Sequence, residues 1–183
     1  MQTYAGKRYF QGRQFKTLME MYRQNVELYG DLFAYRFHRT PDGPEETRTY
    51  RKFVQDIEAF GTALVGMGLK GGHIAVIGEN RYEWAVAHTA VINGVGVSVP
   101  LDRMLPVNEV ADLLVRGEAV AMVFAPKFLG MMKTVAAGNA MIRHFIIMGP
   151  PEGDETLPDD PRFIRMEPLL ETGAKALAEV RKV

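Results

Sequence analysis

The sequence contains no cysteine and a single serine, Ser98. Without cysteine the chain can form no disulfide, no thiolate metal site and no cysteine nucleophile. Ser98 lies inside an apolar run with valine on both sides. A nucleophile elbow instead needs an exposed serine flanked by glycines. We therefore expect no catalytic serine.

Neither an excess of one charge nor a long apolar run is present. The 22 basic and 22 acidic side chains balance, so no overall field favours nucleic acid, an anionic membrane or a polyanionic substrate. No apolar run approaches the roughly 18 residues of a membrane span. The segment from Met1 to Phe15 is polar and basic, unlike a signal peptide. We expect a cytoplasmic protein with no membrane span and no nucleic-acid partner.

Short apolar runs alternate with helical segments through the middle of the chain. Such alternation is typical of βαβ units, in which a parallel sheet carries helices on both faces. The sequence therefore predicts a Rossmann-like α/β fold. The four runs expected as parallel neighbours in one sheet are Ile74–Ile77, Val97–Leu101, Val120–Phe124 and Phe145–Met148. A helix is expected over Glu83–Ile92, between the first two runs, and Pro106 is expected as the first residue of the helix that follows the second run.

A different pattern precedes this core. Apolar residues at helical spacing from Phe15 to Val26 predict a helix that ends at Gly30. Alternation over 33–38, a turn at 41–44 and a return over 47–50 predict a hairpin. Thr49 can cap the following helix. We divide the chain into an N-terminal α/β subdomain, 1–148, and a segment 149–183 with a loop, a short strand and a final helix.

The glycine motifs do not predict a nucleotide site. Residues 66–71 match the letters of the dinucleotide fingerprint, but a helix precedes them and a strand follows. Pyrophosphate binding needs the reverse order, so that the phosphates meet a helix N-terminus. A helix end followed by a turn explains the glycines better. Gly94 and Gly96 similarly suggest a tight turn from helix to strand.

The histidines and paired acids also lack a site pattern. No two of His38, His73, His88 and His144 have the spacing of a helical metal pair. We expect His38 to face solvent from a strand and His88 to be packed and hydrogen-bonded. The acid pairs at 45–46 and 159–160 fall in expected loops and suggest solvated surface. We expect no catalytic, cofactor-binding or metal-binding residue in this chain.

Three stretches resemble the adenylate-forming superfamily of acyl-CoA synthetases, luciferases and peptide-synthetase adenylation domains. The stretch 49–53 (TYRKF) resembles the family's first core motif, and 92–102 (INGVGVSVPLD) resembles its second. Between them, 74–84 (IAVIGENRYEW) is most like bacterial long-chain fatty acid–CoA ligases. The resemblance covers roughly Thr17 to Phe145. The chain departs from the family pattern at His73, where aspartate is usual, and at Arg103, where proline is frequent.

This resemblance implies an enzyme that joins a carboxylate to ATP as an acyl-adenylate and then transfers the acyl group to CoA. The family's phosphate loop is rich in Ser, Thr and Gly, and a chain with one serine cannot hold it in its usual form. We therefore expect an inactive N-terminal fragment. ATP, Mg²⁺, CoA and a fatty acid would serve only the full-length enzyme, and an exposed apolar face of the fragment would favour self-association. The alternative is a self-contained, non-catalytic α/β binding or interaction module.

Overall fold

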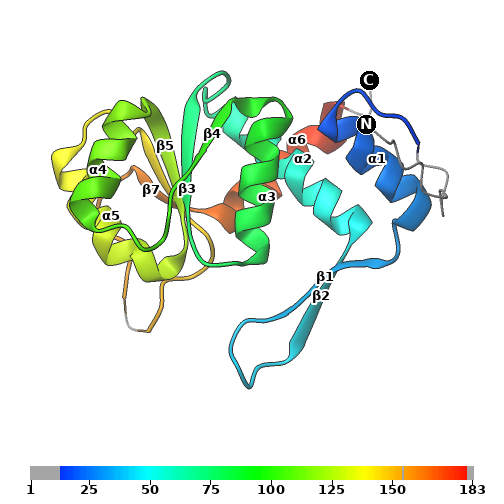
Figure 1. The fold of residues 1–183 in the computed structure, drawn as a ribbon, viewed down its shortest axis with the longest axis horizontal. Helices are drawn as coiled ribbons and strands as arrows, with labels where there is room; N and C mark the ends of the chain where they lie inside the picture. The colour runs from blue at the N-terminus through cyan, green and yellow to red at the C-terminus, as the bar shows by residue number, and fades with distance from the viewer. Residues whose placement is uncertain (1–12, 154, 181–183) are drawn as a thin grey trace, which may run out of the picture.

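The computed structural model describes residues 13–153 and 155–180, which form a parallel sheet between two layers of helices (Figure 1). The sheet has the order β4-β3-β5-β6-β7. Its strands are β3 (His73–Ile77), β4 (Val97–Pro100), β5 (Ala119–Phe124), β6 (His144–Ile147) and β7 (Phe163–Arg165). The helices are α1 (Leu18–Tyr29), α2 (Tyr50–Gly66), α3 (Tyr82–Ala90), α4 (Val107–Arg116), α5 (Leu129–Gly138) and α6 (Met166–Val180).

All neighbouring strands of this sheet run parallel, which confirms the predicted α/β fold. In β3, Ala75 pairs with Val99 of β4 and with Met122 of β5. The chain passes through α3 between β3 and β4 and through α5 between β5 and β6, which supplies the long crossover that parallel neighbours require. The predicted strands at 74–77, 97–101, 120–124 and 145–148 are displaced by no more than one residue at any end.

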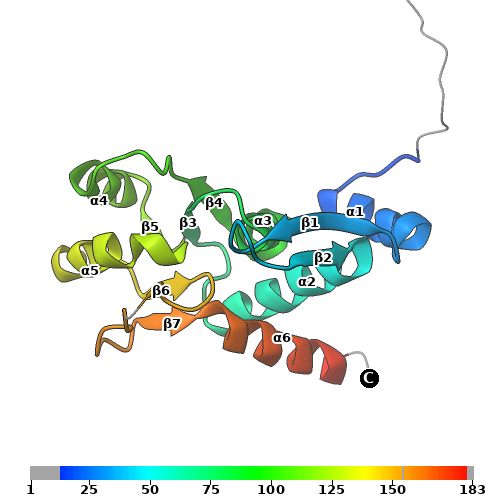
Figure 2. The same cartoon turned by 90° about the horizontal axis from the view of Figure 1, so that it is seen from below.

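The sheet separates two apolar cores because successive side chains of a strand point to opposite faces. Ile74 and Val76 face a core formed with α2, α3 and the start of α6. Ala75 and Ile77 face a second core formed with α4 and α5. Figure 2 shows these two helix layers on either side of the sheet. Strands β3, β5 and β6 are buried on both faces, which explains why their sequences are continuous apolar runs rather than alternating ones.

The N-terminal helix and hairpin form as predicted and lie outside the sheet. Strand β1 (Phe33–His38) pairs antiparallel with β2 (Glu45–Thr49), which begins two residues earlier than expected. The Thr49 hydroxyl accepts a hydrogen bond from Lys52 N at 3.1 Å and so caps α2. Figure 1 shows the hairpin projecting from the body beside α3.

Aromatic rings attach the hairpin to the body. Tyr35 lies 4.9 Å from Phe53 of α2 and 5.4 Å from Tyr82 of α3, measured between ring centroids. Tyr22 of α1 meets Phe53 edge-on at 5.8 Å. Aromatic pairs at these separations contribute about 0.5–1.5 kcal/mol beyond their buried area. The same rings therefore hold α1, the hairpin and the first core together.

Two local predictions need correction. The helix expected over Glu83–Ile92 stops at Ala90 and continues as a π-type turn, Val91–Val95, because Asn93 and Gly94 leave helical backbone angles. Pro106 was expected as the first residue of α4 but is its N-cap, with an extended ψ of 160°. The glycines of 66–71 end α2 and turn the chain toward β3, as expected, with φ +73° at Gly68.

The segment after residue 148 joins the same sheet and helix layer. Strand β7 pairs with β6, where Ile146 meets Ile164. Helix α6 runs beside α2 (Figure 2), and a β-carbon on Gly173 would overlap the carbonyl oxygen of Ala59. The two helices can approach this closely because glycine has no side chain. Over the part of the chain that the structure describes, no helix is both long and apolar enough to cross a bilayer.

Candidate functional site

The strand order creates a topological switch point between β3 and β5. The chain leaves β3 to form β4 on one side and then crosses to β5 on the other. The connections after these two strands therefore diverge, and ligands of open parallel sheets bind outside the carboxyl ends of the strands at such points. Residues 78–81 follow β3, and residues 125–127 follow β5. The fold by itself points to this edge as the candidate site.

Charged side chains bridge the switch point. Lys127 Nζ, after β5, lies 3.4 Å from Glu79 Oε2, after β3. Arg81 contacts Glu79 Oε1 at 3.3 Å and Glu83 Oε2 at 3.1 Å. The Arg81 side chain is only 17% exposed. Its charge is thus held between two carboxylates, with little of it facing solvent.

The hairpin reaches the same edge through Arg39. One Nη of Arg39 lies 2.7 Å from Glu83 Oε1, and the Phe37 ring stacks on Tyr82 at 5.9 Å. Burial of Glu83 favours its neutral form. The hydrogen bond from Arg39 and the charges of Arg81 and Arg39 outweigh this, so the pKa of Glu83 lies below its usual value. Glu83 is therefore an ionised anchor for the hairpin, and it does not exchange protons near neutral pH.

A third glutamate, Glu167, follows the edge strand β7 and lies near Arg81. Gly149 follows β6 with φ +102°, a conformation that favours glycine. A β-carbon there would lie 3.4 Å from Arg81 Nη2 and 3.8 Å from Glu167 Oε1. The Oε2 atoms of Glu79 and Glu167 are buried without a hydrogen bond, although each has a cation within ion-pair distance. These two oxygens are acceptors that water or a donor group could still satisfy.

The cations at this edge are not free to bind a nucleotide. Within 13–153 and 155–180 no three His, Asp or Glu side chains gather as a metal site, but Mg²⁺ bound to a nucleotide needs only one or two carboxylates besides the phosphates and water. A triphosphate needs a cradle of backbone N–H groups and cations. Here the cations Arg81 and Lys127 are already paired with carboxylates. The ion pairs at this edge connect the hairpin, α3 and the segment after β5.

His88 and Ser98, treated separately in the sequence, are bonded to each other. His88 Nδ1 lies 2.9 Å from Ser98 Oγ, and the imidazole stacks on Trp84 at 5.0 Å. Burial lowers the pKa of His88. The predicted packed, hydrogen-bonded His88 is confirmed. Ser98 lies within strand β4 rather than on a sharp turn, so the pair lacks the geometry of a nucleophile elbow.

The other histidines occupy separate places in the fold. His38 is exposed on the hairpin, as expected, with Nδ1 at 2.8 Å from Gly43 O. His73 Nδ1 lies 2.6 Å from Gly117 O. His144 has a buried Nδ1 without a hydrogen-bond partner, and burial together with the neighbouring Arg143 lowers its pKa.

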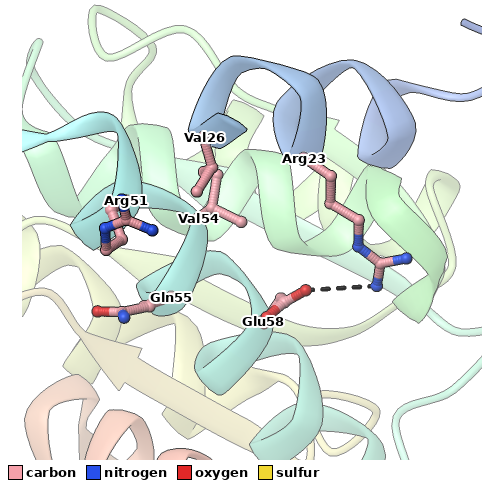
Figure 3. A pocket seen from close by; sticks show the side chains of 6 residues that line it. All are labelled: Arg23, Val26, Arg51, Val54, Gln55 and Glu58. Carbon is pink, nitrogen blue, oxygen red and sulfur yellow. Dashed lines mark hydrogen bonds and ion pairs between the residues drawn. The ribbon is translucent and has the colours of Figure 1, made fainter. Parts of the chain in front are cut away.

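Two open hollows lie beside α2, on the face of the sheet that α2 and α6 cover. The first, about 300 Å³, lies between α1 and α2, and Figure 3 shows the six side chains around it: Arg23, Val26, Arg51, Val54, Gln55 and Glu58. Arg23 reaches across it to Glu58 Oε1 at 3.4 Å. The second, about 310 Å³, adjoins the π-type turn and includes Asn93 and Gly94 in its wall. Both are open to solvent, and the Arg23–Glu58 pair lies in both linings.

The fold and its motifs match one family. A family model described as AMP-binding enzyme covers residues 22–174. The chain belongs to this family of AMP-binding enzymes. The match extends over α2, the whole parallel sheet and the start of α6, which confirms the resemblance seen in residues 49–53, 74–84 and 92–102.

Individual relatives of this AMP-binding domain are CoA ligases and related adenylating domains. A propanoyl:CoA ligase of Rhodococcus jostii, named for a methyl-dioxo-octahydro-indenyl group, is 30% identical over 83 residues, or 45% of this chain and 16% of the relative. A structure described as a long-chain-fatty-acid CoA ligase from Rhodopseudomonas palustris is 21% identical, with a TM-score of 0.69 over 84% of this chain and 36% of that one. The adenylation domain of a carboxylate reductase from Mycobacterium chelonae is 19% identical, with a TM-score of 0.73 over 87% and 29%.

At these identities the structural matches show a shared fold. The chain spans about a sixth of the curated relative and about a third of the two structures. It thus has the architecture of part of an adenylate-forming CoA ligase.

Proposed function

We propose that this chain is the N-terminal portion of an ATP-dependent acid–CoA ligase. The observation that carries the proposal is the AMP-binding family match over residues 22–174. The Rhodococcus relative is a CoA ligase, and the Rhodopseudomonas structure is described as one. The reaction would join a carboxylate to ATP as an acyl-adenylate, release pyrophosphate and then transfer the acyl group to CoA. The motif at 74–84 favours a fatty acid as the carboxylate, and we propose a cytoplasmic location.

Within that enzyme, the proposed role of this chain is scaffolding. Adenylation is accelerated by cations and N–H groups positioned around the reacting phosphate. The cations at the switch point, Arg81 and Lys127, are instead committed to Glu79 and Glu83. ATP, Mg²⁺ and CoA would therefore be held mainly by residues outside this chain, and this chain would support the sheet edge on which they are placed.

The first test is ATP–pyrophosphate exchange by the purified chain in the presence of fatty acids of several lengths. The expected result is no exchange above a heat-treated sample. Steady exchange that depends on ATP and a fatty acid would overturn the scaffold role while supporting the ligase chemistry.

The second test concerns the ligase assignment itself and uses the coding sequence beyond the codon for Val183. The expected result is an open frame that encodes a loop rich in Ser, Thr and Gly and ends in Pro-Lys-Gly. A stop codon directly after Val183 would favour a self-contained binding module and overturn the ligase assignment.

A further inference from the structure

The pair Asn93–Gly94 differs from every other asparagine site in the chain. The five asparagines are followed by Val26, Arg81, Gly94, Glu109 and Ala140. Only Gly94 offers a backbone nitrogen with no neighbouring side chain to hinder its approach to the asparagine amide. Asparagine is among the thermolabile residues of proteins. The next question is whether the fold leaves this pair free to react.

The local backbone is irregular at this pair. Asn93 has φ −95° and ψ 30°, in the sparsely populated bridge region. Gly94 has φ +119°, which side-chain-bearing residues rarely adopt. Both lie in the π-type turn Val91–Val95, after the regular helix has ended. Regular helical backbone, in which each nitrogen is fixed by its i−4 hydrogen bond, would resist the rotation that ring closure needs.

The surroundings leave room for a ring. Gly94 is exposed, and a β-carbon placed on it would meet no heavy atom within 4 Å. The pair lies in the wall of the second hollow, which is open to water. One contact opposes the reaction: Asn93 Nδ2 donates to the Thr89 carbonyl oxygen at 2.8 Å. This single hydrogen bond, on a half-exposed side chain, must open before the amide carbon can turn toward Gly94 N.

We propose that Asn93–Gly94 is a site of spontaneous deamidation that loosens the attachment of β4. The Gly94 backbone nitrogen loses its proton and attacks Asn93 Cγ, so that an N–Cγ bond forms. Nδ2 then takes up a proton from water, the Cγ–Nδ2 bond breaks, and ammonia leaves. Water opens the resulting succinimide at either carbonyl carbon, which gives aspartate or isoaspartate at position 93.

The product matters because backbone hydrogen bonds of the next residues join the start of β4 to the start of β3. Val95 O accepts from Gly71 N at 2.6 Å, and Val97 N donates to Gly72 O at 3.0 Å. Between them, Gly96 lies against Gly72 without space for a β-carbon. Isoaspartate inserts one extra carbon into the backbone two residues before Val95, where these contacts begin. The register that holds Val95 and Gly96 against Gly71 and Gly72 cannot accommodate the added length unchanged.

The test incubates the folded chain at mildly alkaline pH and compares it with the chain unfolded in urea. Peptide mass spectrometry and enzymatic methylation of isoaspartate locate and count the product. Asn93→Gln is the blocking variant, because closing the larger ring of glutamine is slower. Asn108→Gln is the matched control, since Asn108 is exposed on α4 and is followed by Glu109. Thermal unfolding of both variants verifies that they fold, and Asn93→Asp serves as a second variant that cannot release ammonia.

We expect product at position 93 in the folded chain, with loss of the signal in Asn93→Gln and its retention in Asn108→Gln. Amide hydrogen exchange at Gly71 and Val97 should be faster in the aged chain than in the fresh one. The site is overturned if the folded chain stays unmodified at 93 while the urea-unfolded chain converts. Unchanged exchange at Gly71 and Val97 after conversion would overturn the loosening of β4.

Discussion

Gly96 and Gly72 are in direct backbone contact, and a β-carbon on Gly96 would overlap the carbonyl oxygen of Gly72. Gly96 has an extended φ of −177°, which any residue can adopt. Glycine is needed at position 96 only because the contact with Gly72 leaves no room for a side chain. The contact places β4 beside β3 at the register in which His73 pairs with Val97. The stretch 92–102, which matches the family motif, thus has a structural explanation.

Gly96→Ala is expected to destabilise the chain strongly. The clash is with rigid backbone, so the cost should reach or exceed the roughly 1–3 kcal/mol typical of overpacking. Urea unfolding followed by circular dichroism measures it. Gly130→Ala is the control, because Gly130 lies in α5 with open space around it, and alanine there should stabilise the helix by about 0.5–1 kcal/mol. Equal stability of the two variants would contradict the contact.

The parallel sheet could be predicted from the sequence because β3, β5 and β6 are buried on both faces and stand out as apolar runs between helices. The exact end of α3 could not. Its π-type turn depends on Gly94 adopting φ +119° and on Gly96 meeting Gly72, more than twenty residues earlier in the chain. Helical periodicity carries no information about a contact of that kind. Pro106 was misplaced by one residue for a related reason, since proline suits both the first helical position and an extended residue before it.

Gly173→Ala should separate α6 from α2. The added β-carbon would overlap the carbonyl oxygen of Ala59, which belongs to the helix opposite and cannot rotate away. We expect a loss of at least roughly 1–3 kcal/mol in the free energy of unfolding and earlier proteolytic cleavage of 166–180. Thr172→Ala is the control, because Thr172 is exposed on the same helix. If α6 folds independently of the sheet, both variants will unfold with the same midpoint.

Tyr82→Phe should remove one buried hydrogen bond while keeping the aromatic ring. The Tyr82 hydroxyl donates to Asp56 Oδ2 at 2.7 Å, and Asp56 is a buried carboxylate that also contacts Lys52 at 2.6 Å. Hydrogen bonds to charged groups contribute about 1.5–3 kcal/mol, so a loss of that size is expected in chemical unfolding. Tyr22→Phe removes a hydroxyl from the same aromatic cluster and should cost less. Burial and Asp56 also raise the pKa of Tyr82, so its phenol should titrate above the ordinary value of 10.0.

The pair Trp84–His88 gives the chain a built-in pH reporter. Trp84 is the single tryptophan, and its ring stacks on His88 at 5.0 Å. A protonated imidazole in contact with an indole quenches its fluorescence. Because burial lowers the pKa of His88, the quenching midpoint should lie below the ordinary 6.5. His88→Gln should abolish the transition, whereas a midpoint at or above 6.5 would contradict the burial of the ring.

The free energy of unfolding should also depend on pH through His88, and it should decrease as the pH falls. Above pH 6.5 His88 is neutral in both the folded and the unfolded chain and has no effect. As the pH falls through 6.5, the unfolded chain takes up a proton that the folded chain resists, so the free energy of unfolding decreases. The decrease ends when the pH passes the lower pKa of the folded state. His88→Gln should keep part of this dependence, because the pKa of His144 is lowered as well.

The candidate site was less predictable than the fold. Glu79 and Lys127 meet only because β3 and β5 are neighbours, and strand order is not visible in a single sequence. The signal that could have found them is the charge directly after each buried strand, combined with the rule for switch points. His88 and Ser98 are ten residues apart on a helix and a strand, and their bond depends on how α3 crosses β4. Sequence spacing alone cannot supply that angle.

The last prediction concerns self-association. Four large apolar side chains are exposed within six residues where α1 ends and β1 begins: Leu28, Tyr29, Leu32 and Phe33, with Leu32 61% exposed. Large exposed apolar patches are unusual on monomers and drive association. We expect light scattering across a dilution series to show a mass that rises with concentration, and the double variant Leu28→Glu with Leu32→Glu to lower it. Met104→Glu is the control, since Met104 is 79% exposed in the loop before α4. A clean monomer of the unmodified chain at high concentration, with little binding of an apolar dye, would contradict an open apolar face and favour the self-contained binding module.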